Sequence, residues 1–158
     1  MTLCTIVGMG PGIGYSIAKK FGGQGFEIGM IARNEDQLQQ YELSLWESDI
    51  ASSYAVADAG NSAELKAALH KVGTNPQVLI YNAAVLEKSS IDTLSAAKLT
   101  EDFRVNVAGA LVAVQHVLPP MLKAGGTILF TGGSFAHVPN PTRRALRVAP
   151  RRYGNGAR

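Results

Sequence analysis

The sequence predicts an α/β fold in which helices cover both faces of a parallel, doubly wound sheet. Segments typical of strands and of helices alternate five times, at intervals of about 25 to 30 residues, which is the pattern of repeated strand–helix–strand units. The predicted strands are nearly continuous apolar runs, as expected where both faces of a sheet are buried. A chain of 158 residues, 46% hydrophobic and 17% charged, has room for one domain with one core.

Hydrophobic periodicity and turn residues place the individual elements. Strands are predicted at residues 2–7, 26–32, 53–57, 77–81 and 127–131, and helices at 13–21, 34–46, 61–72 and 96–117. Asn34 and Asn61 are expected to cap the second and third helices, and Pro119-Pro120 to end the fourth. Helix 96–117 is too apolar for a single buried face, so we expect it to pack on the sheet and on another subunit of a homo-oligomer.

A glycine-rich turn joins the first predicted strand to the first helix, with the sequence Val7-Gly8-Met9-Gly10-Pro11-Gly12-Ile13-Gly14. Glycine has no Cβ atom, so the chain can turn sharply and an anion can approach the free N–H groups at the start of the helix. The turn is therefore predicted to hold a phosphate group. Its Gly-x-x-x-Gly-x-Gly spacing differs from the Gly-x-Gly-x-x-Gly of most dinucleotide-binding dehydrogenases. A strand-to-helix turn without a ligand is the alternative.

Composition argues against several other classes of protein. The apolar runs are far shorter than the roughly 20 residues that span a bilayer, so no membrane partner is expected. The N-terminus enters the first predicted strand without the segments of a secretory signal. One cysteine, Cys4, allows no disulfide framework, which favours a cytoplasmic location. His70, His116 and His137 stand alone, so no metal site is expected.

Positive charge gathers at the end of the chain. Residues 1–142 carry nine Lys and Arg and all twelve acidic residues, whereas residues 143–158 carry six arginines and no acidic residue. We therefore divide the chain into a domain at 1–140 and an Arg-rich segment at 141–158, which lacks periodicity and is expected to be disordered. Arginines alone attract nucleic acid in a salt-dependent way without sequence preference, so no specific nucleic-acid partner is expected.

Four motifs follow one another in residues 2–138. They are Gly8-x-x-x-Gly12-x-Gly14, Tyr81-Asn82-Ala83-Ala84, Asn106 within a predicted helix, and Gly133-Ser134 after the fifth strand. In this order they resemble the short-chain dehydrogenase/reductase family, although the second departs twice from that family's Asn-Asn-Ala-Gly. The resemblance implies a Rossmann-type sheet of order 3-2-1-4-5, an NAD(P) cofactor, and hydride transfer between it and a small alcohol or carbonyl substrate. It implies catalytic roles for Asn106 and Ser134, and cofactor binding by Gly8, Gly10, Gly12, Ile13, Gly14, Arg33, Asp58, Asn82 and Ala83.

Arg33 bears on the choice of cofactor. It ends the second predicted strand, 25 residues after Gly8, where a carboxylate would bind the ribose hydroxyls of NAD and a cation the 2′-phosphate of NADP. We therefore favour NADP over NAD; a surface arginine paired with Glu35 or Asp36 is the alternative. The resemblance implies that Asp58 accepts a hydrogen bond from the adenine amino group, with a plain turn residue as the alternative.

Different roles are expected for Asn82 and Asn106. The resemblance places Asn82 near the cofactor ribose, and an ordinary loop asparagine is the alternative. Asn106 lies in a mostly apolar helix, where an unpaired amide is costly, so a defined hydrogen-bond partner is expected. In the family that partner is a water and backbone arrangement that leads to the catalytic lysine.

The residues that would protonate a developing alkoxide are missing. The family has a Tyr-x-x-x-Lys pair about a dozen residues after the serine, but residues 139–150 contain neither type, and Tyr153 is followed by Ala157 at the lysine position. We expect impaired catalysis, with a non-catalytic NAD(P)-binding module as the alternative. Because the periodicity and the later strands are lost at the same point, residues from about 142 are interpreted as an out-of-frame or truncated ending of a longer reductase. The fifth strand would then be an unpaired sheet edge, which predicts low solubility.

Overall fold

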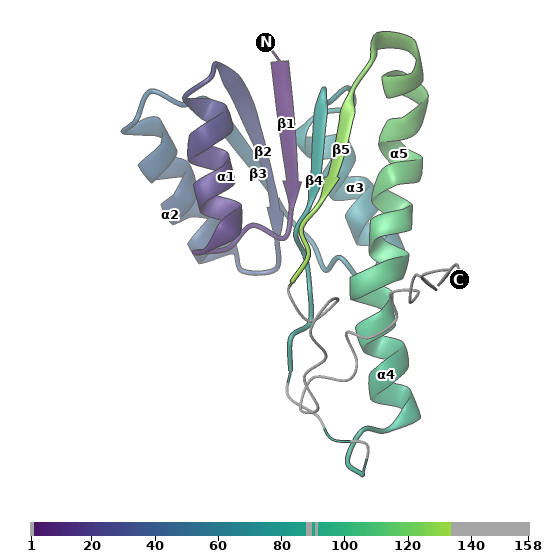
Figure 1. The fold of residues 1–158 in the computed structure, drawn as a ribbon. Coiled ribbons are helices and arrows are strands. Elements are labelled where there is room, and N and C mark those ends of the chain that lie inside the picture. Colours follow the sequence, from purple (N-terminus) through teal and green to yellow (C-terminus); the bar gives the residue numbers. More distant parts are fainter. Residues whose placement is uncertain (1, 88–89, 91, 134–158) are drawn as a thin grey trace, which may run out of the picture.

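Five parallel strands form one sheet in the order β3-β2-β1-β4-β5 (Figure 1). The computed structural model describes residues 2–87, 90 and 92–133. The strands are β1 (Thr2–Val7), β2 (Phe26–Ala32), β3 (Ser52–Val56), β4 (Val78–Tyr81) and β5 (Thr127–Phe130). The predicted fold class and strand order are confirmed, and each strand boundary lies within one residue of its predicted position.

Helices cover both faces of the sheet. They are α1 (Ile13–Gly22), α2 (Glu35–Trp46), α3 (Ser62–Val72), α4 (Ala96–Phe103), the π-helical turn η1 (Arg104–Ala108) and α5 (Gly109–Ala124). In Figure 1, α1 and α2 lie on one side of the sheet, and α3 and α5 on the other. Because successive strand residues point to opposite faces, Ile6 of β1 packs with Leu38 and Leu45 of α2, whereas Val7 packs with residues of α3 and α5.

The register of the central strands brings their carboxyl ends to one edge of the sheet. Val7, the last residue of β1, lies opposite Ile31 of β2 and Tyr81 of β4. The strand β2 lies on one side of β1 and the strand β4 on the other. The strand order therefore reverses at the carboxyl end of β1. Ligands of open α/β sheets bind in the crevice that forms at such a reversal.

Both predicted asparagine caps are present. The side chain of Asn34 accepts a hydrogen bond from the N–H of Gln37 at 3.0 Å. That of Asn61 accepts from the N–H groups of Ala63 and Glu64, and its amide donates to the Glu64 carboxylate at 2.7 Å. These bonds satisfy N–H groups that a helix start otherwise leaves free.

The prediction that Pro119-Pro120 ends the fourth helix is wrong. Helical structure runs without interruption over Ala96–Ala124, with both prolines inside α5. A proline removes one helical hydrogen bond, but Val117 and Met121, on either side of the pair, are buried against the sheet and keep the chain on its helical path. The helix ends instead at Gly125, whose φ of +81° favours glycine.

This long helix has apolar side chains on two faces. Ala113, Val117 and Met121 pack on the sheet. An outer stripe of residues at intervals of four or seven is at least 40% exposed, and consists of Leu99, Phe103, Val107, Leu111, Leu118 and Leu122. By length and composition the helix Ala96–Ala124 is also apolar enough to cross a membrane, a test that core helices of other proteins pass as well.

Strand β5 forms one edge of the described sheet. Within residues 2–87, 90 and 92–133, it pairs with β4 only. Its Leu129 and Phe130 side chains are 43% and 59% exposed. In this part of the chain, the fifth strand is therefore the open edge that the sequence predicts, with a row of free backbone groups.

Candidate functional site

The glycine-rich turn is held against the loop that follows β4. Gly8 has φ of +92°, and a Cβ atom there would lie closer than 3.0 Å to backbone atoms of Asn82 and Ala83. The N–H groups of Gly8 and Met9 both donate to the carbonyl oxygen of Ile31 at the end of β2. Position 8 strongly favours glycine, because both the backbone angle and the close backbone contacts disfavour a side chain.

The start of α1 is open. Gly12 precedes the helix without a side-chain hydrogen bond, and the first turn holds no acidic residue. Cβ atoms built on Gly10 and Gly12 would meet nothing within 4 Å, whereas one on Gly14 would lie 3.2 Å from the carbonyl oxygen of Gly8. Gly14 thus allows close packing, while Gly10 and Gly12 leave free space next to a helix start that attracts anions.

Asn82 joins the three strand ends around the turn. Its amide nitrogen donates to the carbonyl oxygen of Gly8 at 2.8 Å, and its amide oxygen accepts from the Thr131 hydroxyl at 2.8 Å. Its own backbone N–H donates to the carbonyl oxygen of Val7 at 2.7 Å. Asn82 therefore positions the glycine turn relative to β4 and to the end of β5.

A cavity of about 260 Å³ opens at this edge of the sheet. It brings five of the predicted cofactor residues together, namely Gly8, Arg33, Asp58, Asn82 and Ala83. Gly10, Gly12, Ile13 and Gly14 belong to the adjoining turn and helix start rather than to its lining. Asn34, Gln37 and Val105 also line the cavity, and sequence reasoning did not assign them to it. The capping role of Asn34 was the only available signal.

Arg33 lies on the rim of the cavity and is exposed. No carboxylate of the described residues lies within ion-pair distance of it, so the alternative pairing with Glu35 or Asp36 is not observed there. Asp58 has the turn role, because its carboxylate accepts from the N–H of Gly60 at 2.8 Å. Asp58 also faces the cavity, so the turn role and a ligand role are compatible.

A π-helical turn positions Asn106. The amide oxygen of Asn106 accepts from the N–H of Val85 at 2.8 Å, and its amide nitrogen donates to the Val85 carbonyl oxygen at 3.4 Å. The expected defined partner is therefore the backbone of the loop after β4. The Tyr81 hydroxyl donates to the carbonyl oxygen of Val105, and Gly109 has no room for a Cβ atom beside that hydroxyl. Single π-helical turns are frequent at functional sites.

Tyr81 stands where the resemblance expects an asparagine, and its role was not predicted. The side chain is buried, and this burial, followed by the nearby charge of Asp58, raises the pKa of Tyr81 above its ordinary value of 10.0. Tyr81 therefore stays protonated and able to donate its hydrogen bond. No local sequence pattern predicts the hydrogen bond from Tyr81 to Val105, because the two residues are 24 positions apart.

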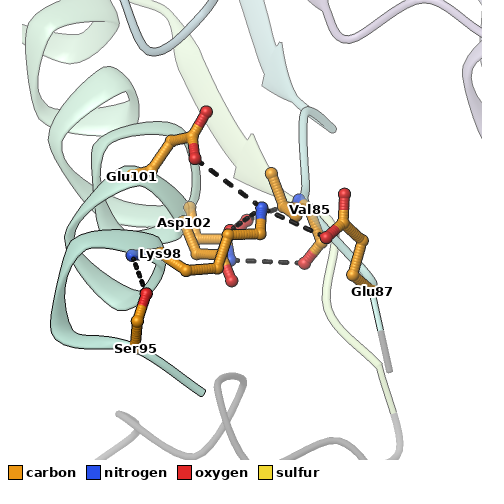
Figure 2. A network of polar contacts seen from close by, with 7 residues as sticks. Val85, Glu87, Ser95, Lys98, Glu101 and Asp102 are labelled. Carbon is orange, nitrogen blue, oxygen red and sulfur yellow. Dashed lines mark hydrogen bonds and ion pairs between the residues drawn. The ribbon is translucent and has the colours of Figure 1, made fainter. Parts of the chain in front are cut away.

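A second, wider cavity of about 760 Å³ adjoins the first. The two share Arg33, Asp58, Ala84, Val85 and Val105. At its far side Lys98 of α4 reaches toward three carboxylates (Figure 2). Its Nζ atom lies 2.8 Å from Asp102, 3.2 Å from Glu87 and 3.9 Å from Glu101. The hydrogen bond to Asp102, and then that to Glu87, raises the pKa of Lys98, which stays charged.

Two of the predicted features, Ser134 and the Arg-rich segment, are not tested by the structure. Ser134 lies outside the described residues, as does the Arg-rich segment 141–158, so the serine and the disorder remain predictions. Over the described ranges, no three His, Cys, Asp or Glu side chains gather as metal ligands would.

Comparisons with known proteins agree with this arrangement. A family model described as short chain dehydrogenase matches residues 2–145. The 2,3-dihydro-2,3-dihydroxybenzoate dehydrogenase of Bacillus subtilis is 28% identical over 144 residues, which are 89% of this chain and 55% of that protein. The human protein named inactive hydroxysteroid dehydrogenase-like protein 1 is 30% identical over 141 residues, which are 82% of this chain and 41% of that protein.

Solved structures show the same fold. A variant of actinorhodin polyketide ketoreductase with NADPH is similar with a TM-score of 0.84 and 21% identity, covering 92% of this chain and 58% of that one. The chain spans about half the length of the curated relatives it matches.

Proposed function

Because the chain belongs to the short-chain dehydrogenase family, a family of oxidoreductases, we propose that its smaller cavity binds the adenosine end of NADP. The observation that carries this proposal is the juxtaposition of an uncapped helix start, a glycine turn and a cavity at the reversal of strand order. Each of these features is what a dinucleotide requires of an open α/β sheet.

The residues present fit such a cofactor. The first turn of α1 has neither a capping side chain nor an acidic residue. The N–H of Tyr15 donates to Gly10, but those of Ile13 and Gly14 have no partner among the described residues and are available to an anionic diphosphate. The free space beside Gly10 and Gly12 lets a phosphate approach the backbone. Asp58, two residues after β3, lines the cavity and is available to accept from the adenine amino group. When bound, the nicotinamide ring supplies or accepts a hydride.

NADP is favoured over NAD because of charge at the end of β2. A carboxylate at this point would bind the ribose hydroxyls of NAD and repel a 2′-phosphate. This chain has Ala32 and Arg33 there instead, and Arg33 is exposed on the cavity rim without a carboxylate partner among the described residues. A guanidinium in this place forms charge-assisted hydrogen bonds with a phosphate.

Fluorescence titration with NADPH and NADH tests the cofactor proposal. Arg33→Ala is expected to weaken NADPH binding about 5- to 30-fold, because an exposed charge-assisted bond is lost, and to leave NADH binding within about twofold. Lys123→Ala, an exposed charge loss on α5, is the matched control and should change neither affinity. If wild-type protein binds neither nucleotide, the proposal fails. If Arg33→Ala affects both nucleotides equally, the preference for NADP fails.

The reaction itself is proposed by family. We propose hydride transfer between the nicotinamide and a small alcohol or carbonyl compound, impaired in this chain because residues 139–150 contain no tyrosine and no lysine. The second candidate is a non-catalytic NADP-binding module; the name of the human relative, which calls that protein inactive, is compatible with it. NADPH turnover with a panel of aldehydes and ketones separates the two. Turnover that survives deletion of residues 143–158 would show that the missing pair is not disabling.

A further inference from the structure

A short segment without regular secondary structure separates the two cavities. Residues 82–87, called here the wall segment, follow β4 and form no helix or strand. Ala84 and Val85 of this segment line both cavities, so the position of the segment sets the width of the adenosine site. Such a segment needs side-chain tethers, because it has no ladder of backbone hydrogen bonds.

Among the described residues, three side-chain interactions hold the wall segment. At its start, Asn82 bonds to Gly8 and to Thr131. In its middle, the backbone of Val85 pairs with the amide of Asn106. At its end, Glu87 is joined to α4 by the ammonium group of Lys98 at 3.2 Å.

The Lys98 tether is anchored in the protein interior. The side chain of Asp102 is 6% exposed and lies one helical turn after Lys98, whose Nζ atom it binds at 2.8 Å. This buried partner fixes the ammonium group, which then presents its remaining donors to Glu87 and, at a longer distance, to Glu101 (Figure 2). An exposed pair such as Lys98–Glu87 is weak when both side chains are free, because ordering two long side chains costs entropy. Here Asp102 has already ordered one of them.

We propose that Lys98 is a positioning residue for the cofactor site, acting through Glu87 to hold the wall segment against α4. This role rests on the proposed function, since the site that the wall segment shapes is the one proposed for NADP. Lys98 itself lines only the wider cavity and not the smaller one, so its effect on the nucleotide is indirect.

The test combines amide hydrogen exchange with NADPH titration in the full chain. In Lys98→Met, which retains the aliphatic part of the side chain, exchange of the Val85 amide, which donates to Asn106, should rise about 3- to 10-fold. The Kd for NADPH should rise by a similar factor. Glu87→Gln should act in the same direction without disturbing the core, because the Glu87 side chain is 67% exposed. Lys98→Arg should keep the exchange rate and the Kd within about twofold of wild type, since a guanidinium can also join Asp102 and Glu87.

Lys123→Met is the matched control, because it makes the same chemical change at an exposed lysine on the same long helix. It should leave both measurements unchanged. The proposal is overturned if Lys98→Met and Glu87→Gln leave exchange in the wall segment within twofold of wild type, or if exchange rises equally throughout the sheet, which would mean general destabilisation. If wild-type protein binds no NADPH, the proposed function fails, and the exchange data alone still decide whether Lys98 holds the wall segment.

Discussion

Gly8→Ala is predicted to destabilise the fold severely. A φ of +92° costs a residue with a side chain about 1–2 kcal/mol relative to glycine. The added Cβ atom would also overlap backbone atoms of Asn82 and Ala83. These atoms cannot move aside by a change of rotamer, so an overpacking cost of about 1–3 kcal/mol is added. The sum of about 2–5 kcal/mol is a large part of the stability of a typical domain.

Urea unfolding of Gly8→Ala beside Gly10→Ala measures this cost. Gly10 is two residues further along the same turn, and a Cβ atom there meets nothing within 4 Å, so its stability should stay within about 0.5 kcal/mol of wild type. With a urea m-value of about 2 kcal/mol/M, the Gly8→Ala midpoint should fall by about 1–2.5 M. Equal midpoints for the two variants would refute the reasoning, because it assigns the requirement for glycine to backbone contact with the loop after β4.

Three further predictions concern the core and the surface. Tyr81→Phe should lower the free energy of unfolding by about 1–2 kcal/mol at pH 7, because the Val105 carbonyl oxygen loses its donor. Since the pKa of Tyr81 is raised above 10.0, the unfolded chain ionises first, and wild-type stability should fall as the pH rises above 10 more steeply than that of Tyr81→Phe in urea titrations. Burial raises the pKa of the Cys4 thiol from 9.0 to about 12. In the folded protein its reaction with a disulfide reagent at pH 8 should therefore be at least about 1000-fold slower than that of a free thiol. Rapid labelling of the folded protein would contradict the buried position. If copies of the chain associate through the outer stripe of the long helix, Leu111→Glu should reduce the sedimenting mass whereas Leu43→Glu on α2, of similar exposure, should not. An unchanged mass for Leu111→Glu in an associated protein would place the contact elsewhere.

The regular elements were predictable because their signals are local. Continuous apolar runs marked the strands, and an amide or carboxylate side chain three residues after each asparagine marked the caps at Asn34 and Asn61. The one local signal that failed was Pro119-Pro120. Proline propensity is a local term, and the burial of Val117 and Met121 against the sheet outweighs it.

Part of the lining of the candidate cavity could be predicted from the sequence, but its contacts could not. Gly8, Asn82 and Ala83 were assigned from motifs, Arg33 from its position after the second strand, and Asp58 from the family resemblance. All five line one cavity. Their partners across the chain carried no signal, because each bond joins residues far apart in sequence. The bond from the Asn82 amide to the Gly8 carbonyl oxygen spans 74 residues, for example.

The sequence by itself determined the alternation of strands and helices, the glycine turn at the end of the first strand and the cation at the end of the second. These follow from the period of apolar residues and from the properties of single residue types, which act over a few neighbouring positions. Only the tertiary structure decided that Tyr81 supports a π-helical turn, that Asn106 binds the backbone of Val85, and that Lys98 joins buried Asp102 to Glu87. The physical reason is that a hydrogen bond depends on where two groups lie in space, and packing of the helices on the sheet sets those positions.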